Sequence, residues 1–90
     1  MNVAEQFGRN LRRARKELDM TQEELGRRSS HHRTQIAAME RGERLPRIDT
    51  LLRVAGALEV SPERLLDGIQ WRPGSHIPGA FEAASPSGRD

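Results

Sequence analysis

Two short helical segments joined by a tight turn constrain the fold of this chain more than any other feature. Thr21 and Glu24 have the spacing of a capping box, so a short helix is expected to begin directly after Thr21. After a turn of about four residues, a second helix is predicted from about Arg33 to Arg41, and Gly42 can end it in the left-handed conformation. Helices joined by so short a turn cross steeply, and the second helix can therefore project from the domain.

The rest of the chain up to about residue 71 also has helical periodicity. An apolar stripe predicts a first helix from about 4 to 18, with Phe7, Leu11, Ala14 and Leu18 on one face. A fourth helix is predicted over 48–58, with a buried face formed by Ile48, Leu51, Leu52, Ala55 and Leu58. Ser61 and Pro62 begin a fifth helix, which Gly68 ends. We therefore predict an all-α fold of five short helices that leaves no room for a sheet.

The composition changes at residue 72, and we take this change as the domain boundary. Proline, glycine and serine interrupt every periodicity from there to residue 90. We predict one helical domain over 1–71 and a flexible tail over 72–90. Local order within the tail is expected only near Ile77 or Phe81.

Several classes of protein are disfavoured by what the sequence lacks. The chain has no cysteine, which removes disulfides, thiolate zinc sites and cysteine nucleophiles. It has no apolar run of roughly 18 residues, the length of a membrane span. Adjacent His31 and His32 do not share a helix face, and Ser29 and Ser30 lack a nucleophile-elbow motif. We expect a soluble, cytoplasmic protein that is not an enzyme and that binds no metal, cofactor or membrane.

Positive charge is concentrated in the first half of the chain. Residues 1–47 hold 11 Lys or Arg against 7 Asp or Glu, whereas residues 48–90 hold 4 against 6. Nearly all of these cations are arginines, whose planar donors match phosphates and guanine edges. A solvated helical surface would have a similar composition, so charge alone favours nucleic-acid binding only slightly.

The second helix of the tight pair has the pattern of a helix that enters the major groove. Ile36 and Met39 lie three residues apart and are predicted to face the core. The positions predicted to face outward are then Arg33, Thr34, Ala37, Ala38 and Arg41. The two alanines allow a close approach to DNA and can contact a thymine methyl group.

Three stretches together carry a family resemblance: LRRARKELDMTQEELGRRS, HRTQIAAMERGERLP and IDTLLRVAGALEVSPERLL. They cover about Phe7 to Leu66, and in this order and spacing they resemble the Xre family of helix-turn-helix regulators. That family has the lambda-repressor-like fold that Cro-type proteins share. The segments HRTQI and ERGER look most like the small controllers of restriction–modification systems.

The resemblance implies specific roles in binding double-stranded DNA. Gln22 would hydrogen-bond a phosphate and brace the recognition helix. Base edges would be met from the third helix, and phosphates from that helix and the loop after it. The residues implied are Arg33, Thr34 and Ala38 for bases, Gln35 for a phosphate or a flanking base, and Arg41 and Arg44 for the backbone. His32, judged from its position alone, either caps the third helix or touches a phosphate.

A structural ion pair and three departures also follow from the comparison with the family pattern. Arg15 and Glu40 occupy positions that form a partly buried ion pair in the family. Gly26 stands where alanine is common and should weaken the second helix by about 1 kcal/mol. Ser30 replaces the usual glycine of the turn, and His31 replaces an apolar residue, so the turn is unusually polar.

The sequence thus predicts a sequence-specific transcriptional regulator. A homodimer is expected, with an interface formed by Leu65, Leu66, Ile69 and Trp71, and it would bind an inverted-repeat operator. The alternative is an interaction module, such as an antitoxin, that holds a toxin or a transcription component through the fold or the tail.

Overall fold

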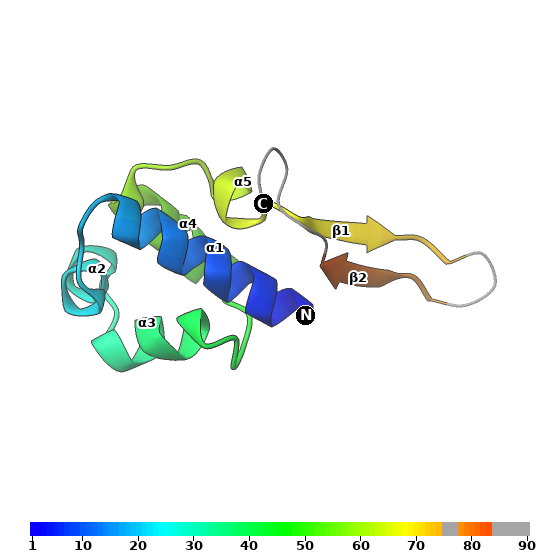
Figure 1. Ribbon diagram of the computed structural model, residues 1–90, viewed down its shortest axis with the longest axis horizontal. Helices are drawn as coiled ribbons and strands as arrows, with labels where there is room; N and C mark the ends of the chain where they lie inside the picture. The colour runs from blue at the N-terminus through cyan, green and yellow to red at the C-terminus, as the bar shows by residue number, and fades with distance from the viewer. Residues whose placement is uncertain (75–77, 84–90) are drawn as a thin grey trace.

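The computed structural model describes residues 1–74 and 78–83, and these form a bundle of five α-helices followed by a β-hairpin (Figure 1). The helices and strands are α1 Val3–Glu17, α2 Gln22–Ser29, α3 Arg33–Glu40, α4 Ile48–Leu58, α5 Pro62–Leu65, β1 Ile69–Arg72 and β2 Ala80–Ala83. The five-helix prediction is therefore confirmed. No helix in this described part of the chain is both long and apolar enough to cross a lipid bilayer.

One hydrophobic core holds the five helices together. α1 packs against α3 and α5, and α2 packs against α3 and α4. The largest fully buried side chains come from every helix: Phe7, Leu11, Leu25, Ile36, Val54, Leu58 and Leu65. Each such side chain stabilises the fold by about 1.5–3 kcal/mol through its removal from water.

The buried face of α4 differs from the predicted one. Ile48 and Leu52 are 76% and 54% exposed, although the sequence periodicity suggested that both face the core. The observed stripe is Leu51, Val54, Ala55 and Leu58. Because Val54 lies at the centre of this stripe and is fully buried, the helix is rotated so that Ile48 and Leu52 face outward. Leu18, predicted to end the stripe of α1, lies beyond its last turn and is half exposed.

The prediction that the chain leaves no room for a sheet was wrong. β1 and β2 pair antiparallel, with Ile69 opposite Ala83 and Trp71 opposite Phe81. α5 has only one turn, and Gly68, with φ of 84°, directs the chain into β1. The apolar residues at 69 and 71 alternate with the period of a strand, although no element was predicted directly after Gly68.

The predicted tail is only partly within the described residues. The boundary proposed at residue 72 falls on the last residue of β1, and Phe81 lies in β2. Ile77 and residues 84–90 lie outside the described residues. The flexibility expected over 72–90 therefore stays a prediction.

Candidate nucleic-acid interface

The turn between α2 and α3 depends on a glycine inside α2. Ser30 has the left-handed conformation, with φ of 63°, at the position where the sequence lacked the usual glycine. The His31 amide donates to the Gly26 carbonyl oxygen at 2.7 Å, which folds the turn back against α2. A Cβ at position 26 would lie 2.5 Å from the His31 carbonyl oxygen. Gly26 is thus required for the close turn and is more than a weak point of the helix.

His31 fastens this turn to α4. Its Nδ1 lies 3.2 Å from the Ser29 hydroxyl, and its Nε2 lies 3.3 Å from the Thr50 hydroxyl. Ser29 is buried and donates to the Leu25 carbonyl oxygen at 2.8 Å. The polar histidine at an expected apolar position therefore has hydrogen-bonding partners on both ring nitrogens, which ties the start of α4 to the helix-turn-helix.

His32 caps the first turn of α3, which is one of its two predicted roles. The Thr34 amide donates to His32 Nδ1 at 3.1 Å, and the His32 amide donates to Gln35 Oε1 at 2.8 Å. This is a reciprocal capping box with histidine in place of serine or threonine. The box fixes the N-terminus of α3, where the predicted base-contacting residues are located.

α3 is anchored on one side and exposed on the other, as its sequence pattern predicted. Ile36 is fully buried, and Met39 is 4% exposed. Arg33 and Thr34 are exposed in the first turn, and Ala37 and Ala38 are partly exposed in the second. The outward face therefore has two polar side chains, Arg33 and Thr34, in the first turn and two small ones, Ala37 and Ala38, in the second. Arg41, the fifth residue predicted to face outward, is exposed at the C-cap.

A buried ion pair joins α1 to the end of α3. Arg15 Nε and Nη2 donate to the Glu40 carboxylate at 2.6 and 2.9 Å, and Arg15 Nη1 donates to the Met20 carbonyl oxygen at 2.7 Å. The hydrogen bond with Glu40 raises the pKa of Arg15 further above its usual value. Gln22 Nε2 also donates to Glu40, at 3.0 Å, so three helices meet at one carboxylate. The expected ion pair is present, and Gln22 braces α3 directly.

The loop after α3 presents cations beside the exposed face. Gly42, with φ of 76°, turns the chain, and Arg41 Nε then donates to Glu43 at 2.6 Å. This hydrogen bond lowers the pKa of Glu43, and the positive charge of Arg44 acts in the same direction. Arg44 is exposed. Arg41 would have to share or exchange its partner to reach a phosphate, whereas Arg44 projects from the loop.

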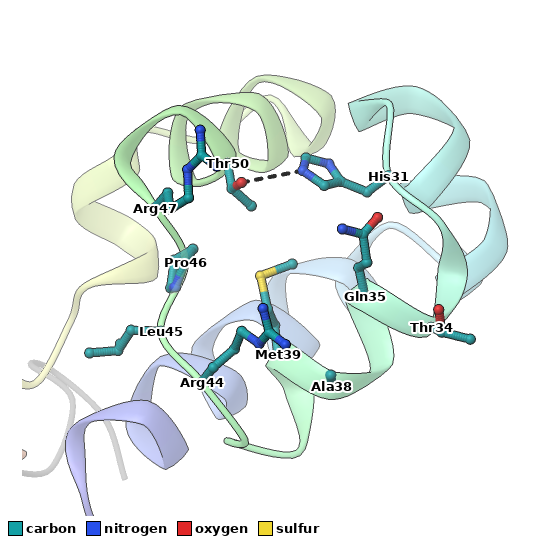
Figure 2. Close-up of a pocket in the computed structure, with 10 residues that line it drawn as sticks. All are labelled: His31, Thr34, Gln35, Ala38, Met39, Arg44, Leu45, Pro46, Arg47 and Thr50. Atoms are coloured by element: carbon teal, nitrogen blue, oxygen red, sulfur yellow. Dashed lines mark hydrogen bonds between the residues drawn. The ribbon is translucent and has the colours of Figure 1, made fainter.

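A hollow of about 380 Å³ separates α3 from the loop and the start of α4. Figure 2 shows Thr34, Gln35 and Ala38 of α3 on one wall, with the loop and the first turn of α4 on the other. The full lining is His31, Thr34, Gln35, Ala38, Met39, Arg44, Leu45, Pro46, Arg47 and Thr50. The structure thus brings together four predicted residues, Thr34, Gln35, Ala38 and Arg44.

Arg47 is a candidate that the sequence reasoning missed. It is exposed, lines the hollow and precedes α4 as its N-cap residue, where its guanidinium pairs with Asp49 of the first turn at 3.4 Å. Helix N-termini attract anions through their unpaired amide groups. The sequence did contain a signal for this residue, because Arg47 directly precedes a predicted helix and lies three residues after Arg44.

The residues predicted for the dimer interface differ in their exposure. Leu65 is fully buried in the core of the single chain, so it has no surface left for a partner. Ile69 is partly buried and packs against the same core. Leu66 and Trp71 are 39% and 54% exposed.

Comparisons with known proteins agree with this geometry. A family described as "Helix-turn-helix" matches residues 11–65, which include all of α2, α3 and α4. The chain belongs to this helix-turn-helix family. The resemblance to Xre-type regulators predicted from the sequence is thereby confirmed, and β1 and β2 lie outside the matched residues.

Relatives with curated descriptions are regulators and control proteins. The chain is 38% identical over 66 residues to an uncharacterized HTH-type transcriptional regulator, y4dJ, of Sinorhizobium fredii, covering 73% of this chain and 86% of the relative. It is 37% identical over 67 residues to the control protein C.BamHI of Bacillus amyloliquefaciens, covering 73% and 83%.

Solved structures give the same result. The restriction–modification controller protein C.AhdI from Aeromonas hydrophila superposes with a TM-score of 0.67 and 32% identity, covering 69% of this chain and 94% of that one. The P22 c2 repressor in complex with a synthetic operator superposes with a TM-score of 0.64 and 35% identity, covering 67% and 91%.

Proposed function

We propose that this protein binds an inverted-repeat operator as a homodimer, with α3 of each copy in the major groove, and so regulates transcription. The general class, a DNA-binding transcriptional regulator, follows from membership of the helix-turn-helix family. One observation carries the finer proposal. Arg33 and Thr34 of α3 are exposed and its two alanines are partly exposed, while Ile36 and Met39 hold the opposite side in the core.

The first turn of α3 is proposed to read bases. Arg33 can donate two hydrogen bonds to a guanine, and Thr34 can contact a neighbouring base edge. Ala38 lies one turn later and is small enough for the helix to approach a thymine methyl group. The His32–Gln35 capping box supports this role because it fixes the backbone from which Arg33 and Thr34 project.

Contacts to the sugar–phosphate backbone are proposed on both sides of α3. Gln22 and His32 would meet the strand before the helix, and Gln35 a phosphate or a flanking base. Arg41 and Arg44 would meet the strand beside the loop, where the hollow of about 380 Å³ can receive a sugar–phosphate segment. Such contacts orient the protein on the duplex without reading its sequence.

Dimerisation is proposed because the resemblance to Xre-type regulators implies it. Two copies related by a twofold axis would place their α3 helices about 34 Å apart, one turn of DNA. The exposed members of the predicted interface are Leu66 and Trp71. A cytoplasmic location and the lack of enzymatic activity stay predictions. The alternative of a module that holds a protein partner is not favoured, because the relatives described above are named as regulators, control proteins or repressors.

The two kinds of contact separate in a titration of an operator and of random duplex at several salt concentrations. Arg33→Ala should lose roughly 1–3 kcal/mol on the operator only, because a base contact is removed. Arg44→Ala should weaken binding to both duplexes and reduce the dependence on salt, because a phosphate contact is removed.

Arg64→Ala is the matched control for the loss of one positive charge. Arg64 lies in α5 and pairs with Glu17 of α1, away from α3 (Figure 1). Its replacement should leave operator affinity nearly unchanged. If Arg33→Ala and Arg44→Ala behaved like Arg64→Ala, the proposed roles of α3 and the loop would be wrong.

A further inference from the structure

The β-hairpin has one apolar face that continues beyond the helical body. Successive residues of a strand face opposite sides, so Ile69 and Trp71 share a face with their cross-strand partners Ala83 and Phe81. The opposite face carries Gln70, Ala80 and the ion pair between Arg72 and Glu82, with Nε and Oε2 2.6 Å apart. The hairpin is therefore amphipathic.

The chain itself covers only half of this apolar face. Ile69 packs against the core, and both strands contact α1 at the base of the hairpin. Further out, the Trp71 and Phe81 rings stack edge to face with centroids 5.1 Å apart, yet they are 54% and 61% exposed. Figure 1 shows the strands extending away from the helices, at the end of the molecule opposite α2.

The placement of Trp71 is specific. A Cβ on Gly79 would collide with the Trp71 ring and would come within 2.5 Å of the Arg72 carbonyl oxygen. The lack of a side chain at position 79 therefore leaves room for the indole of Trp71. A two-stranded hairpin is only marginally stable on its own in water, so burial of its exposed aromatic pair against a partner would stabilise it.

We propose that the Trp71–Phe81 face of the hairpin packs against the same face of a second copy of this chain. This inference rests on the homodimer of the proposed function and names the surface that forms it. A surface that meets itself across a twofold axis must be self-complementary. The hairpin meets this condition, because its apolar face carries no charge and its two charged residues neutralise each other on the other face.

The exposed side of α1 and the segment 84–90 fit this role less well. The exposed side of α1 carries Arg9, Arg12, Arg13 and Lys16, so two copies of it would repel each other. Residues 84–90 contain no aromatic or branched apolar side chain with which to cover the rings. The hairpin also lies outside the residues that match the family, so the family fold does not account for it.

The available area predicts a weak dimer. An aromatic side chain offers about 150–250 Å², so the exposed parts of four rings contribute on the order of 400 Å². A stable interface needs roughly 1,200 Å² or more. Contact must therefore extend to neighbouring residues such as Leu66, which is 39% exposed. We expect the dimer to have a dissociation constant in the micromolar range. Binding of two copies to adjacent half-sites of an operator would then stabilise the dimer.

Trp71 reports on this contact without any mutation. It is the only tryptophan, and the chain has no tyrosine. Its emission should shift to shorter wavelength as protein concentration rises, with the same midpoint as the change in mass seen by sedimentation velocity. Emission that stays constant while the mass doubles overturns the proposal, since the dimer would then use another surface. A wild-type protein that stays monomeric also overturns it.

Two variants sharpen the test. Phe81→Ser keeps the fluorophore and should weaken dimerisation at least about thirtyfold, as loss of a central aromatic contact does. Its helical circular dichroism and its affinity for a single half-site should be unchanged. Leu52→Ser removes an apolar side chain on α4 that is 54% exposed, and it should leave dimerisation unaffected.

The outcomes distinguish this inference from the proposed function. If Leu52→Ser dissociates the dimer and Phe81→Ser does not, the hairpin interface is wrong while operator binding by a dimer stands. If the wild-type protein selects no operator, the proposed function fails whatever Trp71 reports. If Phe81→Ser does not fold, the wild-type titration of Trp71 emission still decides the question.

Discussion

Replacing Gly8 by alanine should destabilise the protein, although alanine is the better helix former. Gly8 lies in the middle of α1, where this helix crosses the end of α3. A Cβ at this position would lie 2.5 Å from the Met39 carbonyl oxygen and 2.7 Å from the Glu40 carbonyl oxygen. Both are backbone atoms and cannot move aside as a side chain can. α1 and α3 would have to separate.

The size of the effect follows from two opposing terms. The change from glycine to alanine inside a helix gains about 1 kcal/mol. Overpacking a closely fitted contact costs typically about 1–3 kcal/mol, and contact with backbone favours the upper end. We expect a net loss of about 1–2 kcal/mol. Each kcal/mol shifts the Tm of a domain of this size by roughly 4–8 °C.

Gly56 provides the matched control, because it also lies inside a helix, α4, but a Cβ there would have no atom from the rest of the structure within 4 Å. Gly56→Ala should raise the Tm, since only the gain in helix propensity remains. Thermal unfolding followed by circular dichroism measures both variants. Operator affinity well below the Tm should fall for Gly8→Ala alone, because α3 is displaced. If Gly8→Ala stabilised the protein as Gly56→Ala does, the close approach of α1 and α3 would be refuted.

Two further predictions concern the groups that hold α3 in place. Glu40→Ala should cost about 3–5 kcal/mol in urea unfolding, because Arg15 is left buried without its carboxylate. The double variant Arg15→Met/Glu40→Leu should recover most of this loss, and a loss below about 1 kcal/mol for Glu40→Ala would mean that the pair behaves as an exposed one. His32→Ala should lose about 1 kcal/mol as the cap of α3 is removed, whereas His32→Asn should retain most of the stability. Equal losses in the two His32 variants would show that the lost stability does not come from the cap.

Local signals in the sequence were sufficient for most of the helical domain. α4 has the predicted bounds. Its apolar residues have helical spacing, and Pro46 before it and Ser61 after it limit its length. The inward side of α3 followed from Ile36 and Met39 alone. The family resemblance added the Arg15–Glu40 pair, which no local pattern contains.

Features that depend on tertiary contact were not predictable in the same way. Two overlapping helical stripes run along α4, and only packing of Val54 decides that Ile48 faces outward. Gly26 was predicted only to weaken α2, because its close contact with the His31 carbonyl oxygen in the turn cannot be inferred from sequence. The hairpin was not predictable because each strand has only four residues and the segment between them contains Pro73 and Gly74, which indicate a loop.

The placement of α3 in the major groove can be tested by directed cleavage of DNA. The chain has no cysteine, so Thr34→Cys provides a unique attachment point for an iron chelate that cleaves nearby DNA. We predict two cleavage centres on a selected operator, related by its twofold axis and about one helical turn apart. The same chelate on Glu63→Cys, in α5, should leave that operator intact. With both labelled proteins first shown to bind that operator by mobility shift, cleavage from position 63 and none from position 34 would contradict the account.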